Sequence, residues 1–145
     1  MMNTAAVMTR EVVVVAPNVT VGGAARMMAR LAIRHLPVVQ AGRLVGILSD
    51  RDLMKHEHGL SCGEVMTVAP VTCSPDAPVG RVAQLMLDHK IDSIPIVSPS
   101  GALTGLVTST DLLWLLVDRG QAQLLPFDFR LRTARSDSEA LAVAA

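Results

Sequence analysis

The sequence predicts a mixed α/β (α+β) fold built from two copies of one β-α-β-β-α unit. Residues 7–39 align with residues 65–97 at a constant offset of 58, and 12 of these 33 aligned positions are identical, where unrelated segments would share about three. In both copies, short β-branched runs alternate with segments of helical periodicity. Half of the 145 residues are apolar, which is enough to form one sizeable folded unit.

A strand and an amphipathic helix are expected at the start of each copy. The β-branched run at residues 12–15 and the weaker run at residues 70–73 predict the two strands. A proline ends each run. Apolar residues then recur at i, i+4 and i+7 from Val21 and from Val79, the spacing of one face of a helix.

Two more strands and a second helix complete each copy. The apolar runs at residues 36–39 and 94–97 carry a proline near the first residue, where a missing ladder N–H matters least. A glycine turn follows each run, at Gly42 and at Gly101. Further strands are expected at residues 44–48 and 103–107, and helices at residues 52–56 and 111–117.

The repeats define the domain organisation. We place the first repeat at residues 7–58 and the second at residues 65–118, and we expect the two to form one folding unit. Residues 119–145 are a C-terminal extension outside the repeat pattern. Within it, residues 124–129 are expected to pack as an arm on this subunit or a partner, and residues 130–145 to form a frayed polar tail.

Composition argues against several kinds of partner. Thirteen basic residues balance 13 acidic ones, so no basic field attracts nucleic acid or an anionic membrane. No apolar stretch approaches the roughly 20 residues that span a bilayer. The thiols Cys62 and Cys73 lack C-x-x-C spacing, and the spacing of His56 and His58 does not indicate a metal site. We expect a cytoplasmic protein with no metal, nucleic-acid or membrane partner.

Three short strings recur in the same order in both copies. They are Val7-Met8-Thr9 with Val65-Met66-Thr67, His35-Leu36-Pro37-Val38-Val39 with Ser93-Ile94-Pro95-Ile96-Val97, and the segment from Gly46 to Asp52 with that from Gly105 to Asp111. On these strings, each copy resembles a cystathionine-β-synthase (CBS) domain, and the chain resembles a tandem CBS pair. The resemblance implies a pseudo-two-fold disc whose two clefts bind adenosine derivatives such as AMP, ATP or S-adenosylmethionine. It implies a stand-alone regulatory module. We do not expect an enzyme, because no acid-base pair or metal cluster can be assembled from the residues.

A Ser/Thr-x-x-Asp pattern stands in both copies where a strand ends and a helix begins, with Asp52 in one copy and Asp111 in the other. The first-turn N–H groups of a helix suit a phosphate, and a carboxylate accepts hydrogen bonds from ribose hydroxyls. The same pattern is also a capping box, in which the two side chains satisfy backbone N–H groups. One residue can fill both roles, and the sequence leaves both open.

The resemblance implies that each cleft takes its hydroxyl and its aspartate from one repeat and part of its base-binding wall from the other. One cleft would hold Ser49, Arg51, Asp52, Val71 and Ser93, and the other would hold Thr108, Thr110, Asp111, Val13 and His35. The two valines are equally well explained as core residues.

The two clefts are expected to be unequal. Repeat 1 has Arg34, His35 and Arg51 where repeat 2 has Asp92, Ser93 and Thr110, so we expect the Asp52 cleft to suit phosphate-rich nucleotides better. The Asp111 cleft would then be empty or would take a less anionic adenosine compound.

Two functions remain open at this point. The first is a regulatory module that senses an adenine nucleotide or related adenosine compound. The second is a structural or interaction module that dimerises and binds a protein partner without nucleotide. The apolar run at residues 112–117, which includes Trp114, predicts a homodimer contact; the alternative is that Trp114 packs between the repeats.

Overall fold

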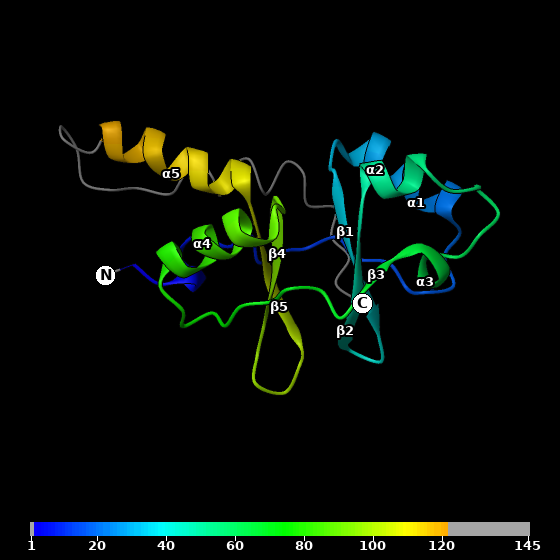
Figure 1. Cartoon of the computed structure of the whole chain (residues 1–145), viewed down its shortest axis with the longest axis horizontal. Coiled ribbons are helices and arrows are strands. Elements are labelled where there is room, and N and C mark those ends of the chain that lie inside the picture. The colour runs from blue at the N-terminus through cyan, green and yellow to red at the C-terminus, as the bar shows by residue number, and fades with distance from the viewer. Residues whose placement is uncertain (1, 122–145) are drawn as a thin grey trace.

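The computed structural model describes residues 2–121, and in it the two repeats lie side by side (Figure 1). The first half contains α1 (Val21–Leu31), β1 (His35–Gln40), β2 (Arg43–Ser49) and α2 (Asp50–Met54). The second half contains α4 (Val79–His89), β4 (Ser93–Val97), β5 (Leu103–Thr108) and α5 (Ser109–Gln121). The 3-10 helix η1 (Thr4–Ala6) precedes the first half, and the helix α3 (Cys62–Val65) and strand β3 (Thr67–Val68) precede the second. The predicted α+β class is confirmed, while the predicted arm and tail at residues 124–145 lie outside the described residues.

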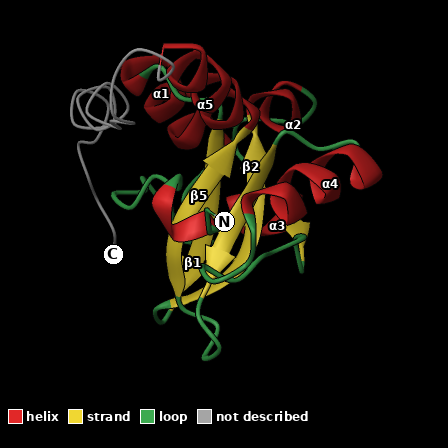
Figure 2. Ribbon diagram, turned by 90° about the vertical axis from the view of Figure 1, so that its left-hand side faces the viewer, coloured by secondary structure: helices red, strands yellow, loops and turns green. Residues whose placement is uncertain are grey.

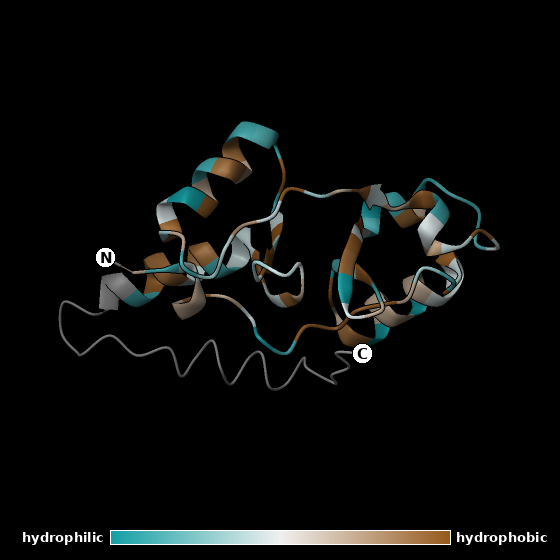
Figure 3. Cartoon of the chain, turned by 90° about the horizontal axis from the view of Figure 1, so that it is seen from below, coloured by the Kyte–Doolittle hydropathy of each residue, from teal (hydrophilic) through white to brown (hydrophobic). Residues whose placement is uncertain are grey.

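Each repeat is built on one antiparallel hairpin. In the first, Pro37 pairs with Ile47 across β1 and β2, and in the second, Pro95 pairs with Leu106 across β4 and β5. The strands lie in the middle of the molecule with helices around them (Figure 2). Hydrophobic and hydrophilic residues alternate along the helices of both halves, as expected of amphipathic helices that cover a sheet (Figure 3).

The predicted opening strands at residues 12–15 and 70–73 are wrong as strands. Each run joins the hairpin through a single parallel bridge, Val15 to Val38 in one repeat and Cys73 to Ile96 in the other. Around the first bridge, the N–H of Val15 donates to the carbonyl of Pro37, at 3.1 Å. The next bond of a parallel ladder would need an N–H from residue 37, which proline does not have. The ladder therefore stops before Val13.

The segments that open the repeats are exchanged between them. We call residues 4–9 and 62–68 the opening segments. Thr9 of the first segment exchanges two backbone hydrogen bonds with Leu106 of β5, at 2.9 and 3.0 Å. β3 of the second segment pairs with β2, so that Thr67 lies opposite Ile47. Each hairpin thus gains its third strand or bridge from the segment that opens the other repeat.

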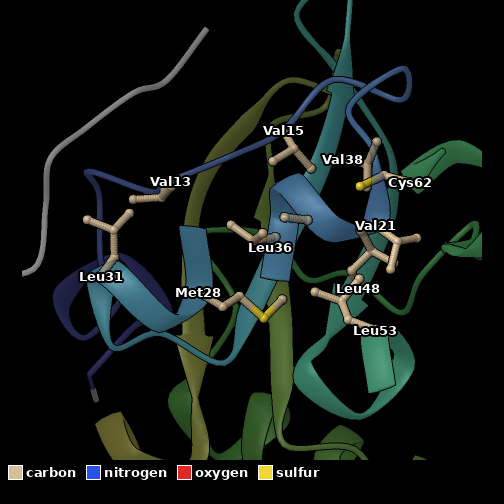
Figure 4. Close-up of a cluster of buried hydrophobic side chains, with 11 residues drawn as sticks. Val13, Val15, Val21, Met28, Leu31, Leu36, Val38, Leu48, Leu53 and Cys62 are labelled. Atoms are coloured by element: carbon tan, nitrogen blue, oxygen red, sulfur yellow. The ribbon is translucent and has the colours of Figure 1, made fainter. Parts of the chain in front are cut away.

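The exchange is visible in the composition of the two cores. The first core, shown in Figure 4, combines side chains of α1, β1, β2 and α2 with Cys62 from the second opening segment. The second core combines side chains of α4, β4, β5 and α5 with Val7 and Met8 from the first. Val12 and Val14 form a third cluster with Leu106 between the repeats. The cysteines are free and buried, and burial raises the pKa of the Cys62 thiol.

Gly105 is the place where the exchanged segment approaches most closely. A Cβ on this residue would lie 2.8 Å from Cγ of Met8 and 2.9 Å from the carbonyl oxygen of Thr9. Gly105→Ala should therefore lower the free energy of unfolding by about 1 to 3 kcal/mol, because backbone must shift to admit the methyl group. Chemical denaturation measures this loss. The matched control is Gly59→Ala, since nothing lies within 4 Å of a Cβ at Gly59; equal stability of the two variants would contradict the close packing.

Candidate ligand-binding cleft

A cleft of about 270 Å³ lies between the two repeats. Three segments form most of its walls: residues 9–13 apart from residue 10, residues 32–35 between α1 and β1, and residues 108–111 at the junction of β5 and α5. Asp92, directly before β4, and Leu106 of β5 complete it. Both repeats therefore contribute to one cavity.

The residues predicted for one of the two clefts do come together here. Val13, His35, Thr108, Thr110 and Asp111 all line the cavity, although they come from segments up to 98 positions apart (111 − 13). Asp92 lines it as well, as expected from its place in the second repeat. Val13 is also part of the first core, with 7% of its surface exposed, so the core explanation of this residue is correct at the same time.

The comparison of the two repeats counted Arg34 toward the cleft of Asp52, but Arg34 lines the cleft of Asp111, beside His35, which was expected there. Ala32 caps helix α1 in the left-handed conformation, with a φ of 54°, and Lys90 caps α4 in the same way, so this turn alone does not determine which cleft the following residues line. The guanidinium of Arg34 reaches back to Asp50 of its own repeat, with Nε 3.3 Å from Oδ2.

The other predicted set is only partly assembled. Ser49 and Asp52 contact each other, and Arg51 is exposed beside them. Val71 packs against the second core, and Ser93 is buried at the start of β4. Two further cavities among the described residues contain none of these five side chains.

Both Ser/Thr-x-x-Asp patterns are capping boxes, so that interpretation is confirmed. The backbone N–H of Thr108 donates to Oδ2 of Asp111 at 2.9 Å, and the N–H of Asp111 donates to Oγ1 of Thr108 at 3.4 Å. The corresponding distances for Ser49 and Asp52 are 2.8 and 3.2 Å. The cap holds the Asp111 carboxylate at the head of α5, where only 3% of the residue is exposed.

The backbone of Val13 is open at the cleft. Among residues 2–121, its N–H and C=O have no hydrogen-bond partner. The interrupted ladder explains the open carbonyl, because Pro37 has no N–H to donate to it. Buried peptide groups are almost always paired, so the N–H and C=O of Val13 are available to water or to a ligand in the cavity.

Two acidic features of the cleft complete the description. Glu11, which sequence reasoning missed, lines the wall two residues before Val13. In an extended segment, residues i and i+2 face the same side, and this spacing was the signal that could have found it. Asp92 Oδ1 lies 2.9 Å from Nε2 of His35, and this hydrogen bond connects the two repeats.

Comparison with known proteins identifies the family. The family model of the CBS domain matches residues 5–59 and again residues 62–118. The chain belongs to the CBS domain family. The two matched stretches correspond to the two halves of Figure 1, so the described chain is a CBS domain pair with its cleft between the domains.

Relatives of this CBS pair include parts of larger proteins. The chain is 38% identical over 106 residues to inosine-5′-monophosphate dehydrogenase of Korarchaeum cryptofilum, a match that covers 72% of this chain and 22% of the dehydrogenase. The chain therefore spans about a fifth of the length of that relative.

Solved structures similar to the CBS pair include two that contain an adenosine compound. One is the CBS domain pair of protein MJ0100 in complex with 5′-methylthioadenosine and S-adenosylmethionine, with a TM-score of 0.77, 28% identity, and coverage of 82% of this chain and 98% of that one. The other is the cytosolic domain of the Mg²⁺ channel MgtE in complex with ATP, with a TM-score of 0.71, 34% identity, and coverage of 78% of this chain and 48% of that one.

Within the described part of the pair, no three His, Cys, Asp or Glu side chains are placed to hold a metal ion. A search of the same residues finds no helix that combines the length and the apolar character needed to cross a membrane.

The capping contacts give a stability prediction. Asp52→Ala and Asp111→Ala should each lower the free energy of unfolding by about 1 kcal/mol, because each change leaves helix N–H groups without their acceptor. Denaturant midpoints measure the loss. Asp76→Ala is the matched control, since Asp76 is exposed and lies outside both caps. An Asp52→Ala variant as stable as this control would show that the cap contributes nothing.

Proposed function

We propose that this CBS pair is a regulatory module that binds an adenosine-containing ligand in the cleft between its two domains. The observation that carries the proposal is the convergence of Val13, with its open backbone N–H and C=O, and the carboxylate of Asp111 on one cavity. An adenosine has a flat base with donors and acceptors on its edge and a ribose with two hydroxyls. These are the groups that such a pair of sites complements.

The ligand is held by both ends in this proposal. The base lies against Val13 and Ile33, and its edge exchanges hydrogen bonds with the Val13 backbone. The ribose hydroxyls donate to Asp111. A carboxylate offers about four acceptor positions, so contact with ribose is compatible with the capping bonds from Thr108. Thr110, exposed at the rim, is placed to contact the 5′ substituent.

Regulation follows from the position of the cleft. Its walls come from both domains, and the hydrogen bond between His35 and Asp92 crosses the same junction. A ligand that contacts both walls favours one relative arrangement of the two domains, and any partner that reads this arrangement senses the ligand. The MJ0100 pair in complex with S-adenosylmethionine and the MgtE domain in complex with ATP support adenosine compounds as the class of ligand.

The first test of this proposal is direct binding. In a thermal-shift panel of AMP, ATP, S-adenosylmethionine and 5′-methylthioadenosine, at least one compound should raise the melting temperature by mass action. For that compound, Asp111→Ala should weaken the affinity measured by calorimetry about ten- to a hundredfold, the effect of losing a charge-assisted hydrogen bond of roughly 1.5 to 3 kcal/mol. Asp111→Asn, which keeps one carbonyl acceptor, should weaken it less. Asp76→Ala is the control. A flat panel, or an unchanged affinity in folded Asp111→Ala, would overturn the proposed site.

The second function, an interaction module that dimerises, is favoured by one specific observation. Helix α5 turns Leu115 into the second core, but Leu113 and Leu116 of the same helix are 60% and 67% exposed. Leu87 of the neighbouring helix α4 is 74% exposed. We propose that this apolar surface of α4 and α5, together with the half-buried Trp114, is a homodimer contact; it is compatible with ligand binding in the cleft.

Sedimentation tests the dimer. The wild-type chain should sediment at twice the monomer mass, and Leu116→Asp should shift it to the monomer, because a charge buried in an apolar contact is strongly unfavourable. Met54→Asp is the matched control: Met54 is 85% exposed but belongs to α2. A wild-type chain that stays monomeric at every concentration would exclude the contact.

A further inference from the structure

The walls of the cleft carry more negative than positive groups. Three carboxylates line it, those of Glu11, Asp92 and Asp111. The cationic side chain of Arg34 also lines it, but its Nε is already 3.3 Å from a fourth carboxylate, that of Asp50. His35 is hydrogen bonded to Asp92. A polyanion that enters this cleft therefore meets carboxylates for which the lining cation offers little compensation.

The head of α5 offers little to a phosphate. The N–H of Ser109 donates to the backbone carbonyl of Asp92 at 2.9 Å, and the N–H of Asp111 donates to Thr108 Oγ1. The buried Asp111 carboxylate lies at the positive end of the helix dipole. The N–H groups of Ser109 and Asp111 and the positive end of the dipole are thus already directed to groups of the protein itself.

From these two observations we infer that the ligand of this cleft is an adenosine compound whose 5′ substituent is neutral or cationic, and not a nucleotide polyphosphate. The inference rests on the proposed function and adds the charge of the ligand. Family membership does not decide this point, because solved relatives are in complex with S-adenosylmethionine in one case and with ATP in another. The charges that line this cleft decide which 5′ substituent it accepts.

Calorimetry on the full chain at low salt tests the inference with four probes: 5′-methylthioadenosine, S-adenosylmethionine, AMP and ATP. Binding is assigned to this cleft by its loss in Thr110→Trp, which places a ring at the rim, and in Asp111→Ala as a second variant. At this cleft, 5′-methylthioadenosine should bind at least about tenfold more tightly than ATP, as expected for a polyanion among carboxylates. Added salt should weaken the binding of S-adenosylmethionine, which is a net cation, and should not weaken the binding of ATP.

A charge-neutral variant separates the charge of the walls from their shape. Glu11→Gln should raise the affinity for ATP by about threefold relative to the affinity for 5′-methylthioadenosine, because only ATP carries the negative charge that Glu11 repels. Glu57→Gln is the matched control, because it makes the same charge change outside the cleft. ATP binding at this cleft as tightly as 5′-methylthioadenosine, or equal effects of the two glutamine variants, would overturn the inference and leave the proposed function intact. Failure of all four probes to bind here would overturn both.

Discussion

The exchange of opening segments between the two domains is the contact on which the rest of the structure depends. Met8 completes the second core, and Cys62 belongs to the first, so neither core closes with the residues of its own repeat alone. The exchange also creates the site. A chain that is hydrogen bonded to Leu106 at Thr9 and to Pro37 at Val15 must cross from one domain to the other in between. The crossing stretch forms a wall of the cleft.

A proline at the third position of the first hairpin strand of each repeat, Pro37 in β1 and Pro95 in β4, links the fold to the binding site. Pro37 lies in the hairpin, where its carbonyl accepts from Val15, but it lacks the N–H that would extend the parallel pairing to Val13. Because this N–H is missing, residues 12–15 do not form a strand, and the carbonyl of Val13 stays unpaired beside the cavity. Helix capping also serves both the fold and the site. The hydrogen bonds that fix the start of α5 also hold Asp111 at the cleft.

Periodicity and repetition were sufficient to predict the hairpins, the two long helices and the capping boxes, because these depend on residues close together in sequence. They were not sufficient for Arg34, because the two repeats pack with pseudo-symmetry and a residue at their junction can face either cleft. Its side depends on how the repeats pack, because both long helices end in the same left-handed turn, at Ala32 and at Lys90, and both Arg34 and Asp92 line one cleft. The prediction of strands at residues 12–15 and 70–73 was wrong for a related reason. These residues have high β-propensity, but the strands beside them contain a proline that has no N–H to donate.

The hydrogen bond between Thr4 and Ala77 joins residues 73 positions apart. During synthesis on the ribosome, Val7 and Met8 emerge well before the α4 helix and the β5 strand that bury them. The early apolar segment therefore waits in an unfolded state while most of the described chain is made, and closure of the longest loop comes at the end of folding. Folding of such a pair should therefore start slowly and then proceed cooperatively, because β5 must be made before residues 4–9 can pair with it.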